Sequence, residues 1–181
     1  MQFTLVSYFS TLSAMKSHTP LLVILLADGL IWLKSSYGKI ISGNFVENLP
    51  TILTKFASEN PHQWYKTFLE TVVIPNYKLF GTLTMWGELF VAVILILSII
   101  CLFFKLLGTK IPTISVFLAL MVAMFLNANF WLASGWTSPA SDSLNILMFV
   151  IELTGAVFFL RNLGGSRRNR TSDPFLIREV L

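Results

Sequence analysis

The chain has 181 residues, of which 55% are hydrophobic and 12% carry a charge, whereas soluble domains contain about 25% charged residues. With a mean hydropathy of +0.72, this composition excludes an ordinary soluble domain and predicts an integral membrane protein whose partner is the lipid bilayer. The net charge of +4 does not indicate nucleic-acid binding, because basic residues beside a membrane helix usually fix its topology.

The cysteine and histidine content argues against the common metal and redox centres. Cys101 is the single cysteine, so neither an intrachain disulfide nor a C-x-x-C pair can form. His18 and His62 both lie outside the apolar runs, which argues against a haem held between membrane helices, and no Cys/His cluster has zinc spacing. We therefore expect no metal site and no intrinsic cofactor.

The chain begins with residues 1–19, which we interpret as an interfacial lead-in. A secretory signal has its basic residues before its apolar core, whereas Lys16 follows the first apolar residues. The first span is expected over residues 20–33, with a weaker continuation to Tyr37. Pro20 can occupy its first helical turn.

Asp28 lies inside this first apolar run. It shares helical spacing with Trp32, Ser35 and Lys39, so the four side chains are expected on one face of the helix. A charged side chain in the membrane costs a few kcal/mol even on lenient scales and usually faces protein or water. Asp28 should therefore face the bundle, where it could pair with Lys39 or with a residue of another span.

Residues 38–77 form a long, partly amphipathic connection. A short surface helix is expected after Pro50, and Asn60 followed by Pro61 predicts the N-cap and first position of another helix. This second helix should lie flat at the membrane interface or cap the bundle, and it should end at Pro75. Its apolar stripe contains Trp64, Tyr65, Phe68, Leu69, Val72 and Val73.

Three further spans are expected over about residues 79–107, 111–135 and 144–160, because each run is long enough to cross a bilayer. The predicted fold is an all-α integral membrane four-helix bundle. It has an amphipathic interfacial helical segment between spans 1 and 2.

The distribution of basic residues predicts the topology. Lys16, Lys105, Lys110 and the C-terminal arginines fall on one side, whereas the loop 136–143 contains no lysine or arginine. By the positive-inside rule, both termini are expected in the cytoplasm.

The composition changes abruptly after residue 163. Residues 164–181 include a Gly-Gly-Ser-Arg-Arg-Asn-Arg sequence and are interpreted as a disordered tail. The tail also resembles an artefactual peptide that arises when a reading frame runs through a transfer-RNA gene. The membrane domain is therefore assigned to residues 20–163.

Several weak motifs, in order and spacing, carry a family resemblance. They are Gly29-Leu-Ile-Trp32, Gly38-Lys39, Gly43-Asn-Phe45, Asn60-Pro61, Trp64-Tyr65, Phe68, Pro75-Asn76, Phe80 and Trp86-Gly87-Glu88. Over about residues 20–160 the chain resembles the DoxX/DoxD family of small four-span membrane proteins of bacteria and archaea. The resemblance implies a multi-pass protein of the cell membrane, a redox partner subunit and a quinone as substrate, since the family includes subunits of thiosulfate:quinone oxidoreductase.

Glu88 is the candidate catalytic residue. It lies on a helical face with Gly81 and Ala92, and small residues there allow close helix approach. Its carboxyl could accept a proton from a quinol or bond a quinone carbonyl. The alternative is a structural carboxyl satisfied by a neighbouring helix.

Further candidates for a quinone or substrate site come from all four spans. Three spans each contribute one acid, and the third contributes Asn127, so one converging polar cluster is an open possibility. Asn127 and Asn129 lie about 200° apart on a helix, so at most one should face it. Trp86 could stack on a quinone ring or anchor the interface. The candidates are Asp28, Trp32, Lys39, Trp86, Asn127 and Glu152.

Three functional hypotheses follow. The first is a membrane subunit of a quinone-linked oxidoreductase that acts on thiosulfate or another sulfur compound. The second is a non-enzymatic membrane anchor or assembly partner of a redox complex. The third is a small-solute carrier, although no internal repeat or pair of broken helices supports it.

Overall fold

The computed structural model describes the backbone of residues 2–104 and 106–168 and the side chains of residues 19–104 and 106–163. This part of the chain is all-α and contains no strand, which confirms the predicted fold class. Its helices in chain order are α1 (Gln2–Ser42), α2 (Phe45–Ser58), α3 (Gln63–Phe68), the π-helix η1 (Leu69–Val73), α4 (Tyr77–Phe104), α5 (Lys110–Ser134), the 3-10 helix η2 (Gly135–Thr137) and α6 (Pro139–Arg168).

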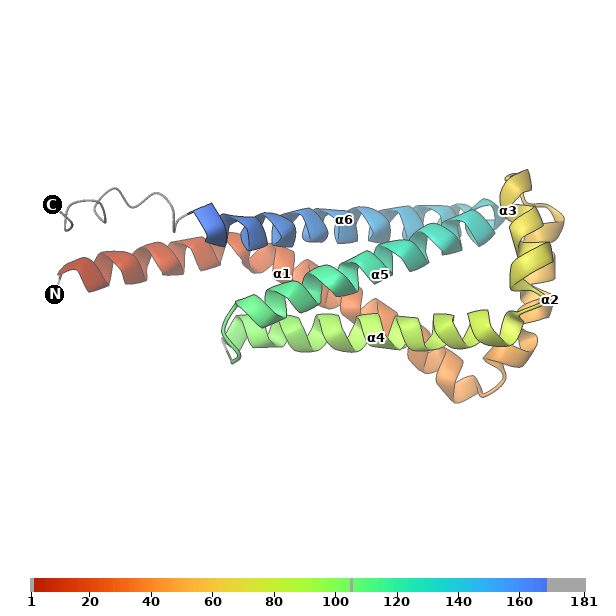
Figure 1. Cartoon of the computed structure of the whole chain (residues 1–181), viewed down its shortest axis with the longest axis horizontal. Helices are drawn as coiled ribbons and strands as arrows, with labels where there is room; N and C mark the ends of the chain where they lie inside the picture. The colour runs from red at the N-terminus through yellow and green to blue at the C-terminus, as the bar shows by residue number, and fades with distance from the viewer. Residues whose placement is uncertain (1, 105, 169–181) are drawn as a thin grey trace, which may run out of the picture.

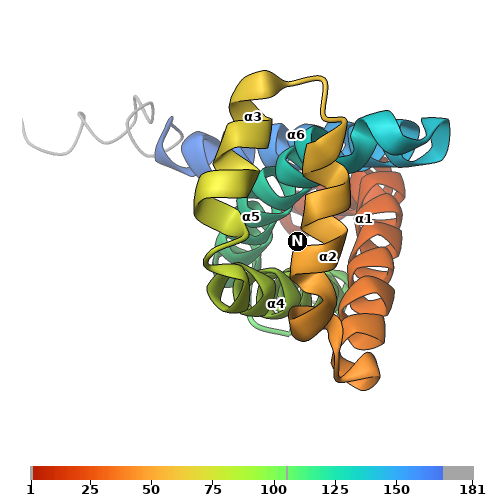
Figure 2. The same cartoon turned by 90° about the vertical axis from the view of Figure 1, so that its right-hand side faces the viewer.

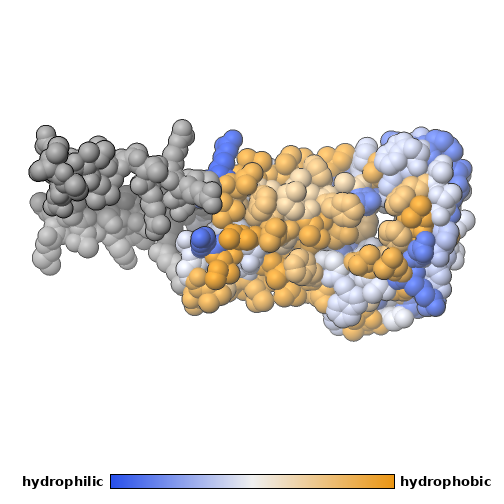
Figure 3. Space-filling view, viewed as in Figure 1, coloured by the Kyte–Doolittle hydropathy of each residue, from blue (hydrophilic) through white to orange (hydrophobic). Residues whose placement is uncertain are grey.

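Four helical segments are long and apolar enough to cross a membrane, which takes about 20 residues. They are Thr19–Ser42 of α1, Tyr77–Phe104, Lys110–Thr137 and Pro139–Leu163. The protein is therefore a multi-pass membrane protein. The space-filling view shows a continuous apolar surface along these helices and a more hydrophilic end (Figure 3), as expected for a bundle surrounded by lipid.

The four long helices run lengthwise and α5 packs between α4 and α6 (Figure 1). The turn between α4 and α5 lies at the same end of the bundle as the start of α1 and the end of α6, whereas the turn between α5 and α6 lies at the opposite end. Lys110 thus lies toward the same end as the terminal helix ends, as the charge distribution predicted.

The core between the long helices is built from small and branched side chains that exclude solvent. Gly155 of α6 permits close packing, because a Cβ there would lie 2.9 Å from Leu120 Cδ1 and 3.0 Å from Leu25 Cδ2. Helix approach through small residues is the usual solution in membranes, where lipid is as apolar as the core. The fully buried residues of this core include Leu25, Val91, Ala92, Leu95, Ile99, Val116, Ala119, Leu120 and Ala123.

Helices α2 and α3 cross the end of the bundle, roughly perpendicular to the long helices (Figure 2). Their buried faces form a second core with the start of α4 and the end of α5. The predicted amphipathic segment is thus a cap on the bundle. Its buried residues are Leu49, Leu53 and Ala57 of α2, Tyr65 of α3, and Leu69 and Val73 of η1.

The local start signals in this cap were interpreted wrongly. Asn60 does not cap α3, which follows His62 instead. The Asn60 side chain donates to the Leu132 carbonyl at 2.9 Å and accepts the His62 N–H at 2.9 Å. The Asn60 side-chain oxygen is thus used just before α3, and its amide group ties the cap to the end of α5. The following Pro61 precedes α3.

The chain ends also differ from the expected boundaries. Pro20 lies inside α1, which begins at Gln2, so residues 2–19 continue the first helix. At the other end α6 continues to Arg168, past the predicted limit at residue 163. The rest of the predicted tail, residues 169–181, lies outside the described residues.

Candidate functional site

Three carboxyl side chains are buried inside the membrane-spanning helices. Asp28 of α1 is 2% exposed, and Glu88 of α4 and Glu152 of α6 are fully buried. A buried charge is costly unless a counter-charge and hydrogen bonds compensate it. Glu88 meets this requirement, whereas Asp28 and Glu152 have no counter-charge among the described residues, and the three carboxyls form two sites.

The first site is an ion pair between α1 and α4. Lys39 Nζ donates to both oxygens of Glu88, at 2.8 Å and 2.7 Å, and to Ser35 Oγ at 2.8 Å. The Lys39 side chain remains 21% exposed, whereas that of Glu88 is fully buried. Glu88 is therefore neutralised by a cation that has its own access to the surface.

A cavity of about 170 Å³ opens beside this ion pair. Phe45 forms part of its wall, and the centre of its ring lies 5.4 Å from Lys39 Nζ, within cation–π range. The turn between α1 and α2 makes this possible, because Gly43 has a φ of 66°, a conformation that favours glycine. The cavity is lined by Lys39, Ile40, Gly43, Phe45, Val46 and Met85.

The second site is the carboxyl cluster, formed by Asp28, Trp32, Asn127 and Glu152. Glu152 Oε1 accepts hydrogen bonds from Trp32 Nε1 at 3.1 Å and from Asn127 Nδ2 at 2.7 Å. Asp28 lies close enough to interact electrostatically with Glu152. Three of the four carboxyl oxygens, Asp28 Oδ1 and Oδ2 and Glu152 Oε2, have no hydrogen-bond partner among the described residues.

The structure distributes the predicted site residues over both sites. Asp28, Trp32, Asn127 and Glu152 come together, but Glu88 does not join them through any hydrogen bond or ion pair of the described residues. Of the two partners considered for Asp28, Lys39 bonds to Glu88 instead. This follows from position along α1, because Asp28 and Lys39 are separated by about three helical turns.

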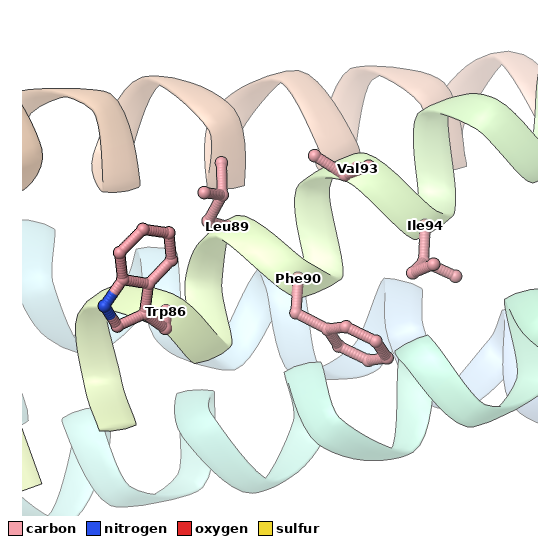
Figure 4. Close-up of a pocket in the computed structure, with 5 residues that line it drawn as sticks. All are labelled: Trp86, Leu89, Phe90, Val93 and Ile94. Atoms are coloured by element: carbon pink, nitrogen blue, oxygen red, sulfur yellow. The ribbon is translucent and has the colours of Figure 1, made fainter. Parts of the chain in front are cut away.

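Trp86 belongs to neither site. It is 54% exposed and lies on the outer surface of α4 in a shallow depression of about 250 Å³. Figure 4 shows its ring among apolar neighbours only, which are Leu89, Phe90, Val93 and Ile94. Trp86 and Glu88 are two residues apart, about 200° around the helix, so they lie on nearly opposite faces of α4.

Asn127 and Asn129 face different surroundings, as their spacing predicted. Asn127 joins the carboxyl cluster, whereas the Oδ1 and backbone carbonyl of Asn129 accept hydrogen bonds from the Tyr65 hydroxyl at 3.2 Å and 3.1 Å. Burial raises the pKa of Tyr65 to about 12, because the charged phenolate would lose its hydration. Tyr65 therefore joins the cap to α5 as a neutral hydrogen-bond donor.

The cavity residues Val46 and Met85 were not predicted from the sequence, and Phe45 entered only through a family motif. Their one local signal is Gly43, which marks a turn that can fold α2 back toward α1. These residues come together because α2 packs against α4. Residue spacing in the sequence does not predict that packing.

Within the described residues no group of three or more histidine, cysteine, aspartate or glutamate side chains could hold a metal ion. The side chains of both sites offer hydrogen bonds and charge. No known protein family, no curated protein and no solved structure matches this chain.

Proposed function

We propose that this chain is a membrane subunit of a quinone-linked oxidoreductase and that it binds the quinone headgroup in the cavity beside Lys39 and Glu88. One observation carries the proposal: Lys39, which is hydrogen-bonded to the buried Glu88, lines an otherwise mostly apolar cavity. A quinone needs this combination, because its ring is apolar whereas its carbonyl oxygens require donors. The resemblance to the DoxX/DoxD family points to the same substrate class.

The size of the cavity fits one ring better than a larger ligand. Its volume of about 170 Å³ is below the roughly 300–1,000 Å³ of typical sites for drug-sized molecules. Phe45 and Met85 supply apolar contact surface for such a ring, and an isoprenoid tail would remain in the surrounding lipid.

The two charged residues have different roles. Lys39 Nζ donates to Ser35 and to both oxygens of Glu88, and on binding one of these three donors would turn to a quinone carbonyl. Glu88 does not line the cavity, so it would exchange protons with the bound headgroup through Lys39. Quinone reduction takes up a pair of electrons and a pair of protons and yields a quinol. The electrons come from a partner subunit that oxidises thiosulfate or another reduced sulfur compound.

The proposed location is the cell membrane of a bacterium or archaeon, with both termini in the cytoplasm. Lys110 and the arginine-rich end of α6 lie toward one end of the bundle, and such basic ends are retained in the cytoplasm. The cap formed by α2, α3 and η1 then lies on the outer side, together with the quinone site.

Binding of a short-chain benzoquinone analogue to the purified protein in detergent tests the proposal. Lys39→Met should weaken binding about 10- to 100-fold, since a hydrogen bond to a charged group contributes roughly 1.5–3 kcal/mol. Lys34→Met is the matched control, because Lys34 is exposed one turn away on the same helix. Equal affinity of wild type and Lys39→Met would contradict the proposal.

The alternative function is a non-enzymatic anchor of a redox complex. The outward depression around Trp86 favours it, since an aromatic and aliphatic surface on a spanning helix can receive another helix. Purification from native membranes followed by mass spectrometry separates the two functions. An anchor retains its partner after Lys39→Met and loses it after Trp86→Ala, without binding the benzoquinone.

A further inference from the structure

The carboxyl cluster is separate from the proposed quinone site. Its two acids lack the compensating lysine that Glu88 has. Asp28 and Glu152 are 2% and 0% exposed, and both lie in segments that can span the membrane. Two ionised carboxylates that interact with each other inside the bundle would be strongly unfavourable, by like-charge repulsion and by loss of hydration. At least one of the two carboxyls therefore needs a compensating cation or a proton.

No side chain of the described residues supplies that positive charge. On α1 the nearest basic residues in sequence are Lys34, which is exposed, and Lys39, which bonds to Glu88. The groups that hydrogen-bond to Glu152 are Trp32 of α1 and Asn127 of α5, and both are neutral. From α4, the buried residues at this depth are apolar or serine.

The hydrogen-bond pattern leaves room for a proton. Trp32 and Asn127 both donate to Glu152 Oε1, which fixes the orientation of that carboxyl. Glu152 Oε2 and both oxygens of Asp28 have no partner among the described residues. A proton on one of these oxygens would neutralise that carboxyl and turn it into a hydrogen-bond donor.

We propose that Asp28 and Glu152 form a proton-binding site between α1 and α6 and hold at least one proton between them at neutral pH. Trp32 and Asn127 are positioning residues that orient Glu152. Asp28 supplies the second carboxyl. Because the site joins the first and last spanning helices, release of the proton would place two like charges between them and weaken their packing.

Infrared spectroscopy of the purified full-length protein at pH 7 tests this site. The wild type should show the carbonyl stretch of a neutral carboxyl, and ¹³C labelling of aspartate or glutamate carboxyls should shift that band without any substitution. The band should be lost in the double variant Asp28→Asn/Glu152→Gln. It should persist in the control Glu59→Gln/Glu70→Gln, which removes two exposed carboxyls.

Three results would overturn the proposal. The first is a wild-type spectrum that contains only carboxylate bands, because the labelled wild type needs no variant to fold. The second is loss of the band in Glu88→Gln, which would assign the proton to the other site. The third is a thermal stability that rises with sodium concentration while both carboxyls stay ionised. That result would show that the site binds an alkali-metal ion and not a proton.

Discussion

At the residue scale, the two buried sites differ in how their carboxyls are compensated. Glu88 has a lysine that bonds both of its oxygens, whereas Glu152 has two neutral donors on one oxygen and a second acid nearby. The same side-chain type therefore serves as half of an ion pair in one place and as part of a proton site in another. Neighbouring residues, not the carboxyl itself, determine this difference.

The Lys39–Glu88 pair predicts a specific pattern of stability. Lys39→Met leaves the fully buried Glu88 without its cation and should lower the free energy of unfolding by about 3–5 kcal/mol, the usual cost of breaking a buried pair. Lys39→Met/Glu88→Leu should recover most of that loss, since it removes both charges. Denaturant unfolding in detergent measures both variants, with Lys34→Met as the exposed control.

A double variant no more stable than Lys39→Met would show that Glu88 does not need Lys39. The loss would then have to come from the apolar contacts of the lysine side chain.

At the element scale, the cap and the long helices are joined at a small number of close contacts. Gly81 of α4 is one of them, because a Cβ there would lie 3.0 Å from Leu49 Cδ2 and 3.3 Å from Val46 Cγ1. Val46 also lines the cavity beside Lys39. The approach of α2 to α4 thus sets the shape of the proposed quinone site.

Two glycine variants test this approach. Gly81→Ala should cost roughly 1–3 kcal/mol by overpacking, and helix propensity returns up to about 1 kcal/mol of it, so the net change should be a destabilisation of up to about 2 kcal/mol. Gly38→Ala is matched in chemistry but has open space around it, and it should stabilise α1 by up to about 1 kcal/mol through helix propensity. Thermal unfolding of both proteins measures the contrast. A stabilising Gly81→Ala would contradict close packing of α2 on α4.

Because of Tyr65, the stability of the folded cap should depend on pH in the alkaline range. Its pKa in the folded protein is raised to about 12 from an ordinary value of 10.0. The stabilisation linked to its neutral form is therefore complete below pH 10 and is lost as the pH rises from 10 through 12. Absorbance titration should show a last tyrosinate component that Tyr65→Phe removes. If that component remains in the variant, it belongs to another tyrosine.

The spanning helices and the amphipathic cap could be predicted because long apolar runs and a helical stripe need no tertiary information. The N-cap assigned to Asn60 failed because its Oδ1 accepts the N–H of His62, which precedes α3, and its amide group donates to the Leu132 carbonyl of α5. Grouping of Asp28 with Glu152 and of Lys39 with Glu88 depends on the relative depth of the helices. Helical spacing orders side chains within one helix and carries no information on depth between helices.

At the scale of the whole molecule, the bundle separates its polar chemistry from the lipid. The spanning surface is apolar, the carboxyl cluster lies between α1, α5 and α6, and the ion pair lies between α1 and α4 near the cap. Each site is thus built from residues far apart in sequence. A molecule that dissolves in the bilayer could reach the cavity at Lys39 from the side of the bundle.

The proposed orientation predicts the outcome of reporter fusions. A reporter fused after Lys110 should be active in the cytoplasm, and one fused after Pro139 should be active outside, because the two positions lie in turns at opposite ends of the bundle. Reversed activities would contradict the positive-inside assignment. They would place the cap and the cavity on the cytoplasmic side.

The most direct measurement for the quinone site is photolabelling of the purified protein with an azidoquinone, followed by peptide mapping. We expect adducts on the cavity residues Phe45, Val46 and Met85, and we expect an excess of unlabelled short-chain benzoquinone to prevent them. Adducts confined to the outward depression around Trp86, or labelling that the unlabelled benzoquinone does not reduce, would contradict a quinone site beside Lys39 and Glu88.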